Sequence, residues 1–162
     1  MTKITSFILL FTIVLAAQER PNSGMGISAS YQTSQLSIVL PFWMDELTVI
    51  APSFGFNSVE DSGQDYQLGI AYKKFLNKEK ASPFLGAHFG AAIYNPESSD
   101  SITDLVFGIA AGGEYFVDRN FSFGIEGQLN GSISDKKSGR FGAIDKLILN
   151  TATVIYATIY FN

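Results

Sequence analysis

The sequence predicts an all-β fold, an eight-stranded antiparallel up-and-down transmembrane β-barrel preceded by a signal peptide. Segments of alternating apolar and polar residues recur along the chain, with short polar connections between them. The 162 residues are 46% hydrophobic and only 16% charged, below the soluble norm of about 25%. After the N-terminus, no apolar run is long enough for a membrane helix. A hydrophobic chain of this kind is typical of a membrane barrel, which satisfies its backbone polar groups between strands.

The first 17 residues have the three parts of a secretory signal peptide. Lys3 supplies the positive charge, residues 7–15 form the apolar core, and Ala16 and Ala17 are the small residues before a cleavage point. A membrane anchor is the alternative, but the apolar run is short and Gln18, Glu19 and Arg20 follow it. We expect residues 1–17 to be a helix or a loose segment outside the barrel, and residues 18–162 to form one barrel domain.

The most informative segment is a predicted hairpin with arms at 105–116 and 121–132, joined by Asp118, Arg119 and Asn120. One face of each arm is aromatic or aliphatic, and includes Phe107 and Phe123. The other face is made of Gly, Ala, Ser, Gln, Asn and Glu, which suits a crowded polar interior better than an outer surface in water. The hairpin is therefore predicted to be inside-out, with its apolar face toward lipid and its polar face toward a lumen.

The remaining strands repeat this alternation. They are predicted at 24–32, 36–43, 47–59, 65–76, 83–95 and 150–161. Phe89, Phe107 and Phe123 are expected to face lipid, with Phe123 near mid-membrane, and Gly90, Gly108 and Gly124 are expected to line the lumen. Pro41 should distort the second strand locally, because it cannot donate to the strand ladder. Trp43, at the end of that strand, is predicted at the membrane interface.

An even number of strands leaves both chain ends on the same side of the membrane, the periplasmic side. The connections at 44–46, 77–82 and 118–120 then lie on that side. Those near residues 33, 60, 96 and 133 lie on the outer side. The last of these, residues 133–149, is the longest connection, as expected for an extracellular loop.

The pattern Gly112-Gly113-Glu114-Tyr115-Phe116, a short turn, then residues 121–126 (Phe-Ser-Phe-Gly-Ile-Glu) resembles a known family. It is similar to the small eight-stranded outer-membrane barrels of Gram-negative bacteria, the OmpA-type transmembrane barrel (outer membrane protein beta-barrel domain). The resemblance extends from about Gly24 to the end of the chain. It implies location in the outer membrane, contact with outer-membrane lipids and lipopolysaccharide, and a monomer. Phe161 also resembles the C-terminal signal of the barrel-assembly machinery, except that Asn162 follows it.

Composition excludes several other classes. The net charge is −4, the pI is about 4.9 and there is no basic stripe, so nucleic acid is not an expected partner. The chain has no Cys and one histidine, His88, which leaves too few ligands for a zinc site. His88 could belong to a catalytic triad on the barrel wall, but its parity directs it into the lumen, where a hydrogen-bonded histidine is the favoured interpretation. No catalytic residue, metal site or cofactor is predicted.

Three charged residues are predicted to point into the lumen near its periplasmic end: Lys73, Glu114 and Glu126. They could form a proton or ion path. The favoured interpretation is a salt-bridge network that plugs the barrel, because unpaired buried charges are costly and the interior of an eight-stranded barrel is just wide enough for side chains to fill. We expect Lys73 to contact Glu114, Glu126 or both.

The longest loop carries a basic cluster, Lys136, Lys137, Arg140 and Lys146. Lys136, Lys137 and Arg140 could contact lipopolysaccharide phosphates or another anion, although an ordinary solvated loop is the favoured interpretation. The predicted function is a non-enzymatic integral outer-membrane barrel with a plugged lumen and a structural or surface-interaction role. A barrel-wall enzyme acting on lipid A and a soluble lipocalin-like ligand-binding barrel remain as alternatives.

Overall fold

A computed structural model describes residues 20–32, 35–59, 63–97, 100–142 and 144–161. The predicted signal peptide, residues 1–17, lies outside them. No helix within this described part is long and apolar enough to cross a membrane. The strands are β1 (Met25–Gln32), β2 (Gln35–Val39), β3 (Phe42–Asp45), β4 (Thr48–Val59), β5 (Gly63–Phe75), β6 (Ala81–Asn95), β7 (Ile102–Phe116), β8 (Phe121–Ile133) and β9 (Leu147–Phe161).

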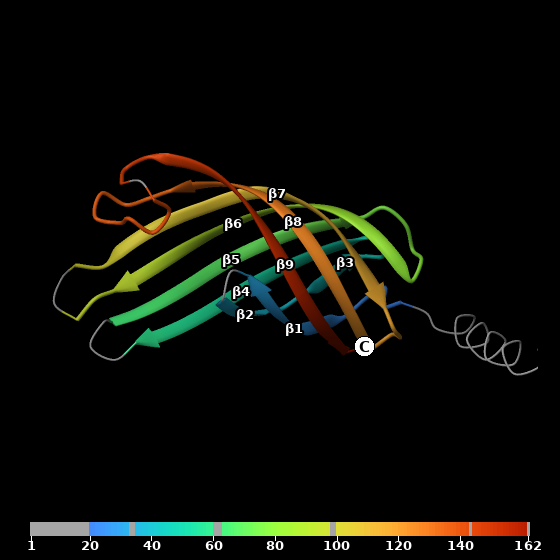
Figure 1. The fold of residues 1–162 in the computed structure, drawn as a ribbon. Helices are drawn as coiled ribbons and strands as arrows, with labels where there is room; N and C mark the ends of the chain where they lie inside the picture. The colour runs from blue at the N-terminus through green and yellow to red at the C-terminus, as the bar shows by residue number, and fades with distance from the viewer. Residues whose placement is uncertain (1–19, 33–34, 60–62, 98–99, 143, 162) are drawn as a thin grey trace, which may run out of the picture.

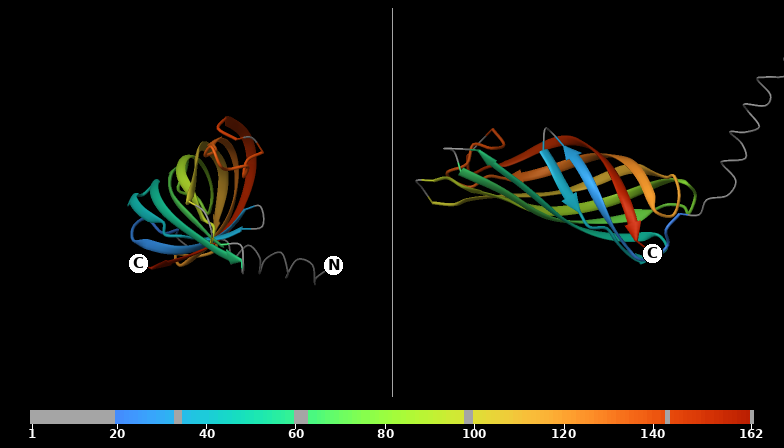
Figure 2. Two further views of the ribbon diagram at one scale, coloured as in Figure 1. Left: turned by 90° about the vertical axis from the view of Figure 1, so that its left-hand side faces the viewer. Right: turned by 90° about the horizontal axis from the view of Figure 1, so that it is seen from below.

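The strands form one closed antiparallel barrel (Figures 1 and 2). From β4 to β9 each strand pairs with the next along the chain, and β9 pairs with β1 from Met25↔Phe161 to Tyr31↔Ile155. The short strands β2 and β3 both lie between β1 and β4, so together they occupy one position in the barrel. The predicted eight-stranded, up-and-down barrel is confirmed.

The break between β2 and β3 falls at Leu40 and Pro41. Proline has no N–H to donate, and this residue interrupts the ladder as predicted. The strand nevertheless stays in the sheet. The Leu40 N–H donates to the carbonyl oxygen of Pro52, and the Gly26 N–H donates to that of Pro41, both at 2.8 Å.

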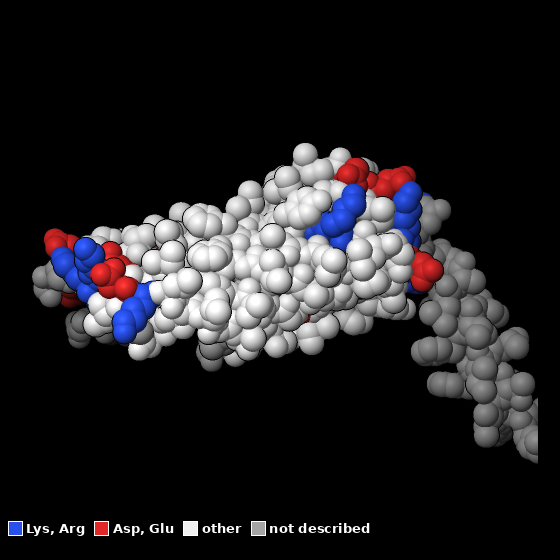
Figure 3. All heavy atoms as spheres, turned by 90° about the horizontal axis from the view of Figure 1, so that it is seen from above, with Lys and Arg blue, Asp and Glu red and all other residues white. Residues whose placement is uncertain are grey.

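The barrel is inside-out. Phe89, Phe107 and Phe123 are 52%, 41% and 51% exposed, which confirms that they face outward. A Cβ on Gly108 would lie 2.6 Å from Asn130 Oδ1, and one on Gly124 would lie 2.4 Å from the ring of Tyr156. These two glycines therefore face the lumen, where only a residue without a side chain fits. The outer surface reflects this arrangement. On the face drawn in Figure 3, charged residues gather at the two ends of the barrel, and the surface between them is uncharged.

Two ends of the barrel must be distinguished. The turn end carries Arg20, Phe161 and the connections at 46–47, 76–80 and 117–120, and the loop end carries the connection at 134–146. Phe123 pairs with Tyr115 just inside the turn end, so the prediction that it lies near mid-membrane is wrong. Phe89 and Phe107, paired with each other, lie near the middle of their strands.

Several strands extend further toward the loop end than the alternation predicted. β7 begins at Ile102 rather than 105, and β9 begins at Leu147 rather than 150. The reason is backbone pairing: β8 and β9 remain in register as far as Ile133↔Leu147. Backbone hydrogen bonds between strands do not depend on a particular side-chain pattern. The paired strands can therefore be longer than the segments that the alternation of side chains predicts.

Candidate functional site in the barrel lumen

At the turn end, the side chain of Arg20 enters the barrel opening. Its guanidinium donates to the carbonyl oxygens of Asn77 and Glu46, each at 2.7 Å, and to the Ser82 hydroxyl at 2.9 Å. Burial lowers the pKa of Arg20, and the negative charges of Glu114 and Glu46 oppose part of that shift. Arginine remains charged after such a shift, so one cation joins the lead-in segment to two different turns.

The same guanidinium lies on an aromatic cluster, which we define as Trp43, Phe75, Phe84, Phe116 and Tyr160. The Arg20 Cζ atom is 4.8–5.1 Å from the ring centroids of Phe75, Trp43 and Phe116. Trp43 stacks on Phe75 with ring centroids 5.3 Å apart and is only 8% exposed. The prediction that Trp43 lies at the membrane interface is therefore wrong: its side chain points inward, against the rings of Phe75, Phe116 and Tyr160 and the guanidinium of Arg20.

Above this aromatic cluster, Lys73 on β5 meets Glu126 on β8, with Nζ 3.0 Å from Oε2. The ammonium also lies over the rings of Phe84 and Tyr156, at 4.5 and 4.0 Å from their centroids. Both charged side chains are largely buried, at 15% and 7% exposure. The pair therefore crosses the lumen between strands that are not neighbours in the sheet.

Glu114 is held differently from Glu126. Its carboxylate accepts hydrogen bonds from the hydroxyls of Ser122, Tyr156 and Tyr160, the two tyrosines at 3.1 and 2.8 Å. Glu114 is 4% exposed. Three hydroxyl donors and the nearby charge of Arg20 satisfy this carboxylate without a direct salt bridge.

Polar side chains continue from Glu126 toward the loop end on the lumen face of β8. Gln128 donates to Glu126 at 2.7 Å, and Asn130 donates to Gln128 at 3.2 Å. A ring nitrogen of His88, Nε2, lies 2.9 Å from Asn130 Oδ1. The predicted lumen position of His88 is thus where the structure places it, at the end of a chain of hydrogen bonds.

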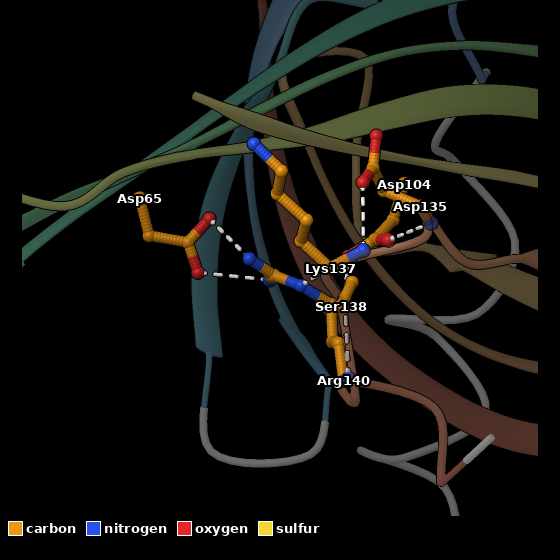
Figure 4. A network of polar contacts seen from close by, with 6 residues as sticks. All are labelled: Asp65, Asp104, Asp135, Lys137, Ser138 and Arg140. Carbon is orange, nitrogen blue, oxygen red and sulfur yellow. Dashed lines mark hydrogen bonds and ion pairs between the residues drawn. The ribbon is translucent and has the colours of Figure 1, made fainter. Parts of the chain in front are cut away.

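At the loop end, Arg140 reaches back from the 134–146 connection onto two strands (Figure 4). It makes a bidentate contact with Asp65, with nitrogen to oxygen distances of 2.9 and 3.0 Å, and its Nε lies 3.0 Å from Asp104 Oδ2. Asp104 is fully buried and also accepts from the Ser138 hydroxyl and the Asp135 N–H, both at 2.8 Å. Burial acts to lower the pKa of Arg140, but the bonds and charges of Asp65 and Asp104 raise it overall.

The three basic loop residues therefore have different environments. Arg140 is engaged by carboxylates of its own chain, and the Lys137 ammonium lies 2.6 Å from Asp100. Lys136 is exposed. The structure does not bring these three side chains together around a common anion-sized space. Within the described part of the chain, no cluster of three or more His, Cys, Asp or Glu residues is arranged to hold a metal ion.

Sequence reasoning missed Arg20, Tyr156, Tyr160, Asp65 and Asp104. The two tyrosines had a usable signal, because they alternate with the outward-facing Ile155 and Ile159. Arg20 had none, since it precedes the first strand. The two aspartates lie near the loop-end limits of β5 and β7, where alternation no longer indicates which side chains meet.

Comparison with known proteins gives matches in structure and none in sequence. No family model and no curated protein sequence matches the chain. Among solved structures, it is similar to the N-terminal β-barrel domain of Pseudomonas aeruginosa OprF, with a TM-score of 0.59, 12% identity, and coverage of 89% of this chain and 100% of that one. It is also similar to Neisserial surface protein A (NspA), with a TM-score of 0.53, 13% identity, and coverage of 85% and 93%.

Both of these structures are small barrels, and the similarity extends over most of each chain. The resemblance expected from the sequence is thereby confirmed at the level of fold. The chain has the OmpA-type, eight-stranded barrel fold.

Proposed function

We propose that this protein is an integral outer-membrane β-barrel with a sealed lumen, without enzymatic activity, that has a structural or surface-interaction role in a Gram-negative envelope. The apolar outer face supports the membrane location, because Phe89, Ile109, Leu85 and Ile125 are each more than half exposed. A face of this composition is suited to lipid and unsuited to water. Export through the predicted signal peptide is part of the proposal.

The observation that carries the sealed lumen is the arrangement at the turn end. Arg20 lies on the aromatic cluster, and Phe75 and Phe116 are essentially fully buried there, which supports a seal at this end. The Lys73–Glu126 pair lies just above them and joins β5 to β8. Side chains from several strands meet at this end, so a continuous water path would require the aromatic cluster and Arg20 to separate.

Conductance measurement tests the proposal directly. The purified, folded protein reconstituted in a planar bilayer should give no large, stable single-channel current. Folding is checked by the change in gel migration on heating, which folded membrane barrels show. A large and persistent conductance from the folded wild-type monomer would contradict a sealed lumen. The membrane location has its own test: the protein should be found in the membrane fraction and be released from it by detergent. Its absence from that fraction would contradict the membrane location.

Two other functions receive less support. A lipid A enzyme would need catalytic groups on the lipid-facing wall, but His88 lies in the lumen against Asn130. A lipocalin-like carrier would need an apolar interior, but the β8 lumen face is Glu, Gln, Asn and Ser. Lipid A mass spectra from a strain lacking the gene would be unchanged under our proposal and altered if the protein modifies lipid A.

A further inference from the structure

The lumen contains a cavity of about 570 Å³. Its floor is the upper side of the aromatic cluster, including Phe75 and Tyr160, and its roof includes Arg140 and Phe141 from the 134–146 connection. This volume falls within the range of about 300–1,000 Å³ that is usual for small-molecule sites. The chamber is therefore bounded by the aromatic cluster toward the turn end, and Arg140 and Phe141 line it toward the loop end.

The walls of this chamber carry hydrogen-bonding groups. The hydroxyls of Ser37 and Ser53 extend over Gly55 and Gly69, at 3.0 and 2.6 Å from the positions where a glycine Cβ would be. On β6, two strands from Ser53, the second ring nitrogen of His88, Nδ1, is buried and has no hydrogen-bond partner among the described residues. A buried polar atom is normally satisfied, so this nitrogen is a position for a bound solute or a water molecule.

Each charged side chain that lines the chamber already has partners within the protein. Lys73 pairs with Glu126, hydroxyls hold Glu114, and two aspartates hold Arg140. An ionic solute would have to break one of these arrangements or remain unpaired in a confined space. Hydroxyl and amide groups on the walls instead favour an uncharged solute rich in hydroxyls.

Arg140 lies at the loop end of the chamber. Its side chain joins the connection that forms the roof to Asp65 on β5 and Asp104 on β7. At the turn end, Arg20 lies on the aromatic cluster, in which Phe75 and Phe116 are fully buried. We propose that the chamber is a binding site for a small uncharged polyhydroxy solute, such as a monosaccharide, and that Arg140 is the latch through which the solute enters from the loop end.

The chain has no cysteine. A single introduced thiol therefore reports how readily a reagent reaches the chamber, with no labelling of other residues of this kind. Ser53→Cys places a thiol on the chamber wall, and the probe is N-ethylmaleimide, a small uncharged thiol reagent. With the latch intact, labelling of the folded barrel in detergent should be slow. Adding Arg140→Gln should accelerate it by about tenfold or more, the order expected when opening no longer breaks charge-assisted hydrogen bonds.

Lys137→Gln is the matched control, because it removes a cation from the same connection and leaves the Arg140 contacts intact. It should label at the same slow rate as Ser53→Cys alone. If Arg140→Gln does not fold, as judged by heat-dependent gel migration, Arg140→Lys provides the second variant, since lysine keeps the charge but cannot make the bidentate contact. If the folded Ser53→Cys barrel is labelled at the same rate with Arg140 present and with Arg140 replaced, Arg140 does not control entry to the chamber.

Solute binding is tested in the unlatched barrel with glucose and glucose 6-phosphate, which differ by one charged group. Glucose should slow labelling of Ser53→Cys in proportion to its concentration, and glucose 6-phosphate should have no such effect. Protection by neither sugar would mean that the chamber holds water only, and equal protection by both would remove the preference for an uncharged solute. Either result would overturn the binding site. The folded barrel is used in detergent, so the outcome does not depend on the proposed membrane location or on conductance.

Discussion

Lys73 and Glu126 join two strands of the barrel that never pair. β5 and β8 are separated by β6 and β7 in the sheet, yet Nζ of Lys73 lies 3.0 Å from Oε2 of Glu126. A contact of this kind must cross the lumen, so it links opposite parts of the wall as well as filling the interior. The nearby Glu114 accepts hydrogen bonds from three hydroxyls instead. Among the described carboxylates, Lys73 therefore pairs with Glu126 alone.

Replacing Lys73 with Met should destabilise the barrel by about 3 kcal/mol, because Glu126 is left charged and unpaired in a largely buried position. The measurement is urea unfolding of the protein in lipid vesicles. Adding Glu126→Gln should recover much of the lost stability, since neither replaced side chain then carries a charge. Adding Glu114→Gln instead should recover little. Equal rescue by both second changes would argue against a specific Lys73–Glu126 pair.

Arg20→Ala should lower stability by about 2 kcal/mol, through loss of hydrogen bonds to two turns and of contact with the aromatic cluster. Arg20→Lys is the informative control, because it retains the cation without the planar group that reaches Asn77 and Glu46 together. We expect its unfolding midpoint to lie between those of the wild type and Arg20→Ala. A midpoint for Arg20→Ala equal to that of the wild type would show that the guanidinium does not hold the turn end.

Arginine on the outer face should have an effect that depends on depth. Phe89→Arg, near the middle of β6, should destabilise the barrel in lipid by about 2–4 kcal/mol, and Phe123→Arg, near the turn end, by about 0–1 kcal/mol. Phe89→Leu and Phe123→Leu control for loss of the ring. Unfolding in vesicles measures each. Indifference of the Phe89 position to arginine would mean that this face does not contact the bilayer core.

Titration should distinguish the two lysines at the start of the longest loop. The hydrogen bond and charge of Lys137 lower the pKa of Asp100, so the ion pair is present above the ordinary aspartate pKa and is lost as pH falls through the lowered one. Lys137→Met should raise the pKa of Asp100 toward its usual value, and Lys136→Met should leave it unchanged. NMR titration of the Asp100 carboxyl provides the measurement. No response to Lys137→Met would exclude this pair in solution.

The alternation of side chains made the wall of this barrel predictable. A strand exposes every second residue to the same side, so sequence parity alone directed Phe89 and Phe107 outward and His88, Gly108 and Glu126 inward. The break at Pro41 was also predictable, because the missing N–H is a property of that residue whatever surrounds it. These features follow from the geometry of a single strand and from the chemistry of individual residues, so they can be inferred from the sequence.

The contents of the lumen were decided by the tertiary structure. Parity directs Trp43, Glu114 and Tyr160 inward or leaves them at a strand end, but strand register and barrel closure determine which side chains meet. Arg20 and Arg140 lie outside the strands, and no periodicity predicts where their side chains go. They reach the two ends of the lumen because buried carboxylates, carbonyl oxygens and aromatic rings are arranged there only after the sheet has closed.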